Sequence, residues 1–191
     1  MYIAIEGIDT AGKSTQIELL KQTFKEALFI REPGETEIGK KLREIIFKEN
    51  ISKKTELFLF LADRSETIET IIKPNKNKMI ISDRSLISGI AYGLEFFNLE
   101  DLASFNAFAT DKIYPDLVII LKLDRNTLEK RLSLKSHDNI EKRGVDYLLS
   151  IQDNLIYTCE YLNINTLIID AKLSVDKIHQ KIKKIIKDKK C

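Results

Sequence analysis

The chain has 191 residues, of which 43% are hydrophobic and 31% are charged, and its formal net charge is +2. This composition is typical of a globular domain with its own core, and it excludes a disordered or fibrous chain. The longest apolar runs, such as 117–121, are far shorter than the ~20 residues of a membrane-spanning helix, and the near-neutral charge argues against a nucleic-acid partner.

Strand-like and helix-like segments alternate along the sequence. Short runs rich in Ile, Val and Leu predict strands buried on both faces, and the amphipathic stretches between them predict crossover helices. The alternation predicts an α/β fold, a three-layer sandwich in which a five-stranded parallel sheet is flanked by helices, and we expect one domain over residues 1–191. The predicted strands are 2–6, 27–31, 79–83, 117–123 and 166–169, and the predicted helices are 13–26, 38–48, 54–73, 86–96, 99–112, 125–134, 141–162 and 175–187.

The first predicted strand leads into a phosphate-binding motif, G-x-x-x-x-G-K-[ST], at residues 7–14. Glycine permits the backbone angles that turn successive N–H groups towards an anion at the positive end of a helix. In such a loop Lys13 bridges the β- and γ-phosphates, Ser14 ligates Mg²⁺ and Thr15 contacts the α-phosphate. The motif therefore predicts the P-loop NTPase fold, with ATP bound by Gly7, Ile8, Asp9, Thr10, Ala11, Gly12, Lys13, Ser14 and Thr15.

Four further motifs follow in a fixed order. They read R-E-P-G-E-T at 31–36, L-F-L-F-L-A-D-R at 57–64, D-R-S at 83–85 and S-G-I-A-Y at 88–92. In order and spacing they resemble motifs of the thymidylate kinase family, including T-R-E-P-G-G-T, D-R-[YH] and S-G-x-A-[FY]. Two positions depart from that pattern. Glu35 stands where the family has a glycine near a phosphate site, and Ser85 stands where the family has a residue with a ring side chain.

The resemblance implies a reaction and a set of residue roles. A thymidylate kinase moves the γ-phosphoryl group of ATP, with Mg²⁺, onto dTMP and gives dTDP for dTTP biosynthesis. By resemblance, the thymine stacks on Phe60 and accepts from Arg64, Arg84 holds the phosphate, and Tyr92 closes on the 2′ position of the sugar. The implied substrate-binding residues are Asp9, Phe60, Arg64, Arg84, Gly89, Tyr92 and Asp146, and the implied metal ligands are Ser14 and Asp83.

Local chemistry supports some of these roles and leaves others open. Arg84 follows a predicted strand, at the sheet edge where such folds bind ligands, and a guanidinium suits a phosphate monoester. Phe60 and Arg64 are one helical turn apart and face the same side, although Phe60 alone fits a core position better. Tyr92 is equally consistent with packing. Asp9 requires a cation or hydroxyl partner to lie beside phosphates.

A lid is expected over residues 133–145. The segment around 138–141 resembles the D-R-x-E lid signature of the family, with Asn139 in place of the usual arginine. Transfer needs cations against the charge that develops on the phosphoryl group, and the phosphate loop carries no arginine. The candidates are Lys135, Lys142 and Arg143, with Arg143 favoured because its charge is fixed. The predicted catalytic residues are therefore Lys13, Asp83, Arg84 and Arg143.

The remaining expectations concern partners and location. No secretory signal precedes the first strand, so we expect a cytoplasmic protein with reduced thiols. Family members are usually homodimers, and Phe58, Leu61 and 105–108 are candidates for such a face or for the core. Three rivals remain: another nucleotide or deoxynucleoside kinase on the same scaffold, a P-loop switch or regulatory binding protein, and a relic that binds ATP without transfer. The absence of an N-K-x-D motif for guanine argues against the switch protein.

Overall fold

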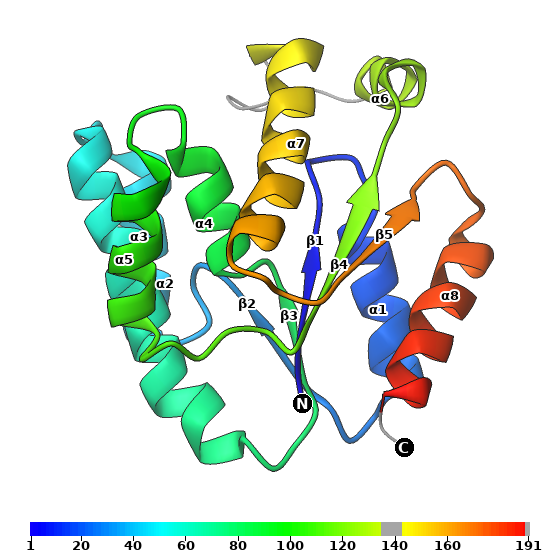
Figure 1. Ribbon diagram of the computed structural model, residues 1–191, viewed down its shortest axis with the longest axis horizontal. Helices are drawn as coiled ribbons and strands as arrows, with labels where there is room; N and C mark the ends of the chain where they lie inside the picture. The colour runs from blue at the N-terminus through cyan, green and yellow to red at the C-terminus, as the bar shows by residue number, and fades with distance from the viewer. Residues whose placement is uncertain (135–142, 190–191) are drawn as a thin grey trace.

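The computed structural model describes residues 1–134 and 143–189, and its centre is one parallel sheet (Figure 1). The strands stand in the order β2-β3-β1-β4-β5, and each neighbouring pair is parallel. The predicted α/β fold with a five-stranded parallel sheet is therefore confirmed. The strands are β1 (Tyr2–Glu6), β2 (Leu28–Arg31), β3 (Ile80–Asp83), β4 (Leu117–Lys122) and β5 (Thr166–Asp170).

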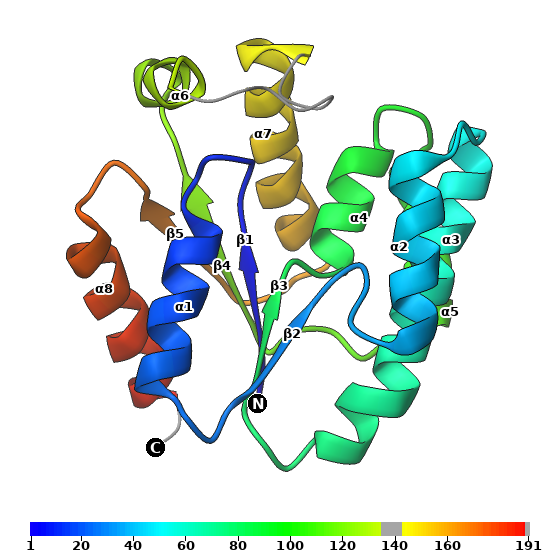
Figure 2. The same cartoon turned by 180° about the vertical axis from the view of Figure 1, so that it is seen from behind.

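Helices cover both faces of the sheet, and α1 and α8 lie side by side on one of them (Figures 1 and 2). Alternate residues of β1 face opposite ways, because Ile3 and Ile5 join one core cluster and Ala4 joins another. The helices are α1 (Lys13–Thr23), α2 (Glu37–Lys48), α3 (Lys53–Thr67), α4 (Leu86–Gly93), α5 (Leu99–Ala109), α6 (Arg125–Leu132), α7 (Val145–Tyr161) and α8 (Val175–Asp188).

Several predicted helices end earlier in the structure: those predicted over 86–96 and 99–112 end at Gly93 and Ala109, and two others end early for a local reason. The helix predicted over 54–73 is regular only to Thr67, and it continues as a π-helical turn (Ile68–Ile72) and a 3₁₀ turn (Lys73–Asn75). Pro74 stands in the 3₁₀ turn, and its ring and missing N–H prevent a regular helix from continuing. The helix predicted over 13–26 ends at Thr23, because Phe24 has φ −117° and ψ 66°, outside the helical region.

The carboxyl ends of three neighbouring strands meet at one edge of the sheet. Ile5 of β1 is in register with Asp83 of β3, which is in turn in register with Arg31 of β2. Sequence segments far apart in the chain, the phosphate loop after β1 and the D-R-S motif at the end of β3, are thereby placed next to each other. Parallel α/β sheets bind their ligands at this edge.

Candidate active site

The phosphate loop depends on glycine at two positions. Gly7 has φ +149°, and a Cβ there would lie 2.9 Å from the carbonyl oxygen of Leu121 on β4. Gly12 has φ +99° and is the residue that precedes α1, so its left-handed backbone turns the loop into the helix. The side chains of Ile8 and Ala11 belong to the core, so these two residues present only backbone groups to a ligand.

Lys13 lies under the loop and is almost fully buried. Its Nζ donates to the carbonyl oxygens of Gly7 at 2.7 Å and Ile8 at 3.1 Å, and it lies 3.9 Å from Oδ1 of Asp9. Burial lowers the pKa of Lys13 to about 8, and the nearby charge of Arg84 acts in the same direction. An anion beside this ammonium would offset both effects, which is the environment expected of a phosphate-binding lysine.

A cavity of about 340 Å³, here called the larger cavity, opens beside the loop. Its wall includes Lys13 and Ser14 of the phosphate loop and the aromatic side chains of Phe96 and Phe97. Six of the residues predicted from sequence to bind dTMP contribute to its wall. They are Asp9, Phe60, Arg64, Arg84, Gly89 and Tyr92.

Arg84 reaches from the end of β3 to the phosphate loop. Its Nη2 donates to Oδ1 of Asp9 at 2.8 Å, and its Nη1 donates to Oγ of Ser88 at 3.1 Å. Its backbone φ is +71°, a left-handed conformation that is unfavourable for a residue with a side chain. The hydroxyl of Ser82 donates to its carbonyl oxygen at 2.5 Å, which helps to hold this backbone. Strained backbone of this kind is concentrated at functional sites.

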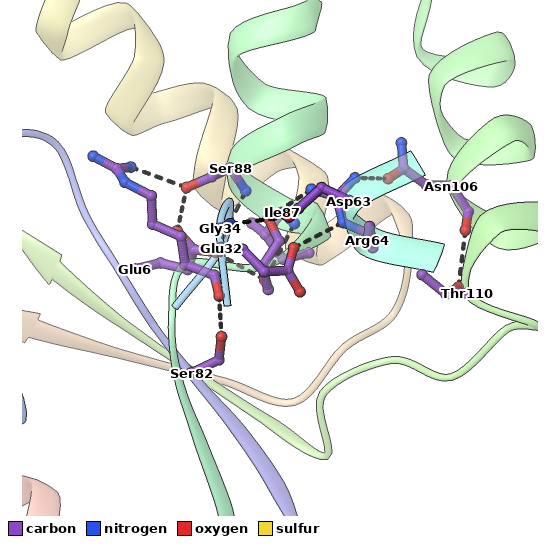
Figure 3. Close-up of polar contacts among 12 residues, drawn as sticks. Glu6, Glu32, Gly34, Asp63, Arg64, Ser82, Ile87, Ser88, Asn106 and Thr110 are labelled. Carbon is purple, nitrogen blue, oxygen red and sulfur yellow. Dashed lines mark hydrogen bonds and ion pairs between the residues drawn. The ribbon is translucent and has the colours of Figure 1, made fainter. Parts of the chain in front are cut away.

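Arg64 has a different environment, enclosed by protein groups (Figure 3). Its Nε donates to Oε2 of Glu32 at 2.9 Å and its Nη1 donates to Oδ1 of Asn106 at 2.5 Å. The side chain is 4% exposed and that of Glu32 is 3% exposed, so the pair is removed from water. Burial raises the pKa of Glu32, and Arg64 acts against that rise. A Cβ at Gly89 would lie 2.8 Å from Nη2 of Arg64, so only glycine leaves room for the guanidinium.

Two polar atoms on this wall have no hydrogen-bond partner within the described part of the chain. They are Oδ1 of Asp83 and the hydroxyl of Tyr92. The Tyr92 ring lies 5.7 Å from the guanidinium carbon of Arg84. Burial raises the pKa of Tyr92 to about 12, so its hydroxyl keeps its proton and can donate to a ligand at neutral pH. Buried polar atoms without partners are rare, and a ligand atom is one explanation.

A second cavity of about 240 Å³, here called the smaller cavity, is also lined by residues of the phosphate loop. Arg131 of α6 lines this cavity and bonds to two backbone carbonyls. Its Nη1 donates to the Thr10 carbonyl at 2.8 Å, and its Nη2 donates to the Ala171 carbonyl at 2.7 Å. The sequence reasoning did not select Arg131, since nothing in a helical pattern shows which basic residue faces a loop. The wall includes Thr10, Gly12, Thr15, Gln16, Arg131 and Val175.

Comparison with known proteins identifies the family. The family model described as thymidylate kinase matches residues 5–182. The chain belongs to the thymidylate kinase family. It is 62% identical to a thymidylate kinase of Nautilia profundicola, over 98% of this chain and 97% of that protein, and 50% identical to one of Campylobacter jejuni, over 97% and 100%. The crystal structure of thymidylate kinase from Ehrlichia chaffeensis is similar with TM-score 0.79 and 25% identity, over 97% of this chain and 98% of that one.

The lid expected of a thymidylate kinase falls largely outside the described residues, which omit 135–142 and with them Lys135, Asn139 and Lys142. Arg143 is described, and both of its terminal nitrogens donate to the carboxylate of Glu95, just after α4, with Nη1 at 2.7 Å. Its guanidinium also lies 3.6 Å from the ring centre of Tyr147. The structure thus places Arg143 against Glu95 and Tyr147, and it does not appear among the residues that line either cavity.

Asp146 and Glu35 are also placed by specific partners. Asp146 is 88% exposed at the start of α7 and pairs with Arg125, and it is absent from the walls of both cavities. Glu35, which departs from the usual thymidylate kinase motif, accepts a hydrogen bond from the backbone N–H of Arg31 at 3.0 Å. The extra carboxylate is therefore occupied by the end of β2 in this structure.

An ATP-using kinase generally implies Mg²⁺, so the question is whether this site offers oxygen ligands for that ion. Among residues 1–134 and 143–189, no three His, Cys, Asp or Glu side chains are grouped so as to hold a metal ion. Ser14 and Asp83 both line the larger cavity, and Oδ1 of Asp83 has no partner in that part of the chain. Mg²⁺ prefers one or two protein oxygens together with water and substrate phosphates. The residues present fit that requirement.

Proposed function

We propose that the chain transfers the γ-phosphoryl group of ATP to dTMP at the junction of the two cavities, with dTMP in the larger one. One observation carries this assignment: Arg84, at the acceptor side, is bonded at 2.8 Å to Asp9 of the phosphate loop. The groups expected to hold the acceptor phosphate and the donor phosphates are therefore in direct contact. Transfer requires this proximity, because the reacting atoms must approach to about 3–3.5 Å in line.

In the larger cavity, Arg84, Phe60 and Arg64 are assigned to the orientation of dTMP. We assign the phosphate to Arg84, which offers a fixed cation, and the thymine to Phe60 and Arg64. Arg43, which the sequence reasoning did not select for the site, also lines this cavity and is held by a 2.8 Å hydrogen bond from its Nη1 to the Pro33 carbonyl. The unpartnered hydroxyl of Tyr92 is assigned to the sugar.

ATP is assigned to the phosphate loop, with its base in the smaller cavity against the guanidinium of Arg131. A planar guanidinium stacks well on an aromatic base. Mg²⁺, held by Ser14 and through water by Asp83, would neutralise phosphate charge. Lys13 is assigned to the β- and γ-phosphates of ATP, and Arg84 is assigned to holding the acceptor phosphate in line with the γ-phosphorus. No protein nucleophile or strong base is required, because the attacking phosphate oxygen is already anionic.

The lid over residues 133–145 is proposed to close on the bound nucleotides and exclude water, which prevents ATP hydrolysis. Of its cationic candidates, Arg143 must leave Glu95 if it is to reach the transferred group. Asp146 must likewise leave Arg125 to touch the substrate. Residues 1–191 are proposed to form one domain that includes this lid.

We further propose a cytoplasmic homodimer. In the described part of the chain, Phe58 of α3 and Phe105 of α5 have ring centres 6.1 Å apart and are 52% and 42% exposed, and Phe108 is 88% exposed. Leu61, by contrast, is buried in the core. Three exposed phenylalanines on neighbouring helices fit a face that pairs with a second copy. The helices of the described residues include none with the length and apolar character of a membrane span.

The test is substrate competition with purified protein, ATP and Mg²⁺. Release of ADP is followed with dTMP, dUMP, UMP, dCMP, AMP or GMP as the acceptor. Strong release with dTMP and weak release with the ribonucleotides and purines is expected. Preference for another acceptor would refute the assignment of Phe60 and Arg64 to thymine. If no acceptor increases ADP release by protein that is shown to bind ATP, transfer itself is refuted. Mass measurement in solution tests the dimer, and Phe108→Glu is expected to shift it towards monomer.

A further inference from the structure

Glu6 is a buried carboxylate that none of the assignments above uses. It is the last residue of β1, immediately before Gly7, and it is 0% exposed. Its Oε1 accepts from the hydroxyl of Ser85 at 2.8 Å. Its Oε2 accepts from the hydroxyl of Ser88 at 2.5 Å (Figure 3). The backbone N–H of Ser88 adds a longer contact to Oε1 at 3.4 Å. The carboxylate is therefore bonded by groups from the first turn of α4.

Burying a carboxylate is costly unless a specific set of partners offsets the loss of water. An apolar residue at position 6 would avoid that cost, as Ile3 and Ile5 do on the same strand. Burial indeed raises the pKa of Glu6, and Arg84 and the two serine hydroxyls act to lower it. A carboxylate kept at such a position calls for an effect that a hydrocarbon side chain cannot produce.

One hydrogen-bond chain leads from Glu6 to the substrate wall. The hydroxyl of Ser88 donates to Glu6, and the same oxygen accepts from Nη1 of Arg84 at 3.1 Å. Since a hydroxyl has one proton, its donation to Glu6 leaves its lone pairs facing the guanidinium. The carboxylate thus fixes the direction in which Ser88 can act, and polarises the bond to Arg84.

We propose that Glu6 is a positioning residue that acts through Ser88 to hold Arg84 in the orientation that binds the acceptor phosphate. The other Arg84 contacts, to Asp9 at 2.8 Å and the Gly7 carbonyl at 3.4 Å, come from the phosphate loop. Asp9 competes with a phosphate for the guanidinium, whereas Ser88 lies on the helix side and holds it when the phosphate arrives. This inference rests on the proposed role of Arg84.

Ser85 provides a matched control, because it bonds to the same carboxylate without a hydrogen bond to the side chain of Arg84. Its Oγ also accepts from the backbone N–H of Ile87, so it caps α4. Ser88→Ala is expected to raise the KM for dTMP about tenfold, as loss of a hydrogen bond to a charged group does, with the KM for ATP changed less than about twofold. Ser85→Ala is expected to lower the melting temperature through the lost cap and to leave the KM for dTMP within about twofold.

Combining Ser88→Ala with Arg84→Met distinguishes an effect of Ser88 on the position of Arg84 from a general effect on the stability of the protein. If Ser88 acts through Arg84, then Ser88→Ala made in the Arg84→Met variant raises the KM for dTMP by less than about twofold over Arg84→Met alone. Glu6→Gln is expected to raise the same KM and to behave in the same non-additive way. An additive effect, an equal rise of the KM in Ser85→Ala, or an unchanged KM in Ser88→Ala would each overturn the proposal. If Arg84→Met alone leaves the KM for dTMP unchanged, the assigned role of Arg84 fails as well.

Discussion

Two arginines on the wall of the larger cavity, Arg64 and Arg84, have opposite surroundings. Arg64 is enclosed, with its charge offset by the buried carboxylate of Glu32 and its Nη1 bonded to Asn106. Arg84 is 20% exposed as a side chain, and its ion-pair partner, Asp9, belongs to the phosphate loop. Burial acts to lower the pKa of Arg84, but the neighbouring Tyr92 phenol and the carboxylates of Asp9 and Glu6 outweigh burial and raise the pKa above its ordinary value.

These surroundings decide which of the two guanidinium groups can offer its positive charge to a ligand. A guanidinium neutralised by a buried partner adds little net charge to the cavity, so Arg64 is suited to reading a neutral base by hydrogen bonds. A guanidinium that faces a loop carboxylate can exchange that partner for a phosphate, so Arg84 is suited to an anion. Residues of the same type in one cavity therefore have separate roles, and substitutions can test the separation.

The largest effect is expected for Arg84→Met. Loss of a fixed cation at the reacting phosphates should lower kcat/KM for dTMP by about 10³-fold, comparable to removal of one electrostatic stabiliser in other enzymes. Steady-state kinetics with dTMP varied at saturating ATP measures this. Thermal unfolding serves as the control, since Asp9 remains partly exposed and can be solvated. A loss smaller than about tenfold would contradict the assignment of Arg84 to the acceptor phosphate.

Arg64→Met should reduce stability, in addition to the loss of its assigned contact with the thymine. It leaves Glu32 buried without its cation, and breaking such a pair costs about 3 kcal/mol of the free energy of unfolding. Denaturant unfolding of the variant and of Arg64→Met/Glu32→Leu checks the cause, because removal of the orphaned carboxylate should restore much of the loss. Equal stability of Arg64→Met and the unsubstituted protein would show that the pair is not the structural element we describe.

Gly89→Ala should affect binding more than stability. The added Cβ would lie 2.8 Å from Nη2 of Arg64, so the guanidinium must move away from its present position. We expect the KM for dTMP to rise about fivefold, while the gain in helix propensity offsets part of the crowding in the unfolding free energy. A higher melting temperature with an unchanged KM would mean that the position of Arg64 does not matter to the base.

The smallest effect is expected for Glu95→Gln, which concerns a third arginine. Both oxygens of Glu95 accept from Arg143, so the amide weakens a contact that the proposed lid closure would have to break to bring Arg143 to the phosphates. We expect kcat to rise by about twofold, because the exposed pair contributes little to stability. The measurement is kcat at saturating substrates, with Arg143→Met as the comparison. A fall in kcat would indicate that the Glu95 contact itself belongs to the active arrangement.

Much of the site was predictable from local sequence patterns. The phosphate loop is a contiguous segment whose glycines, Lys13 and Ser14 have fixed relations within one turn, so its chemistry follows from spacing alone. The sheet was predictable too, since short apolar runs alternate with amphipathic segments. Arg131 and Glu6 could not be found in this way. A basic residue in a helix and an acid at the end of a strand have no local signal for the partners that they meet.

The sequence by itself determined the fold class, the nucleotide-binding loop and the family, because each depends on residue types at fixed short separations. Only the tertiary structure decided how the arginines are used. Glu32 pairs with Arg64 across 32 positions, Asp9 with Arg84 across 75 and Glu6 with Ser88 across 82. Contacts over such separations are set by the order of the strands in the sheet, which brings the ends of β1, β2 and β3 together, and not by any pattern along the chain.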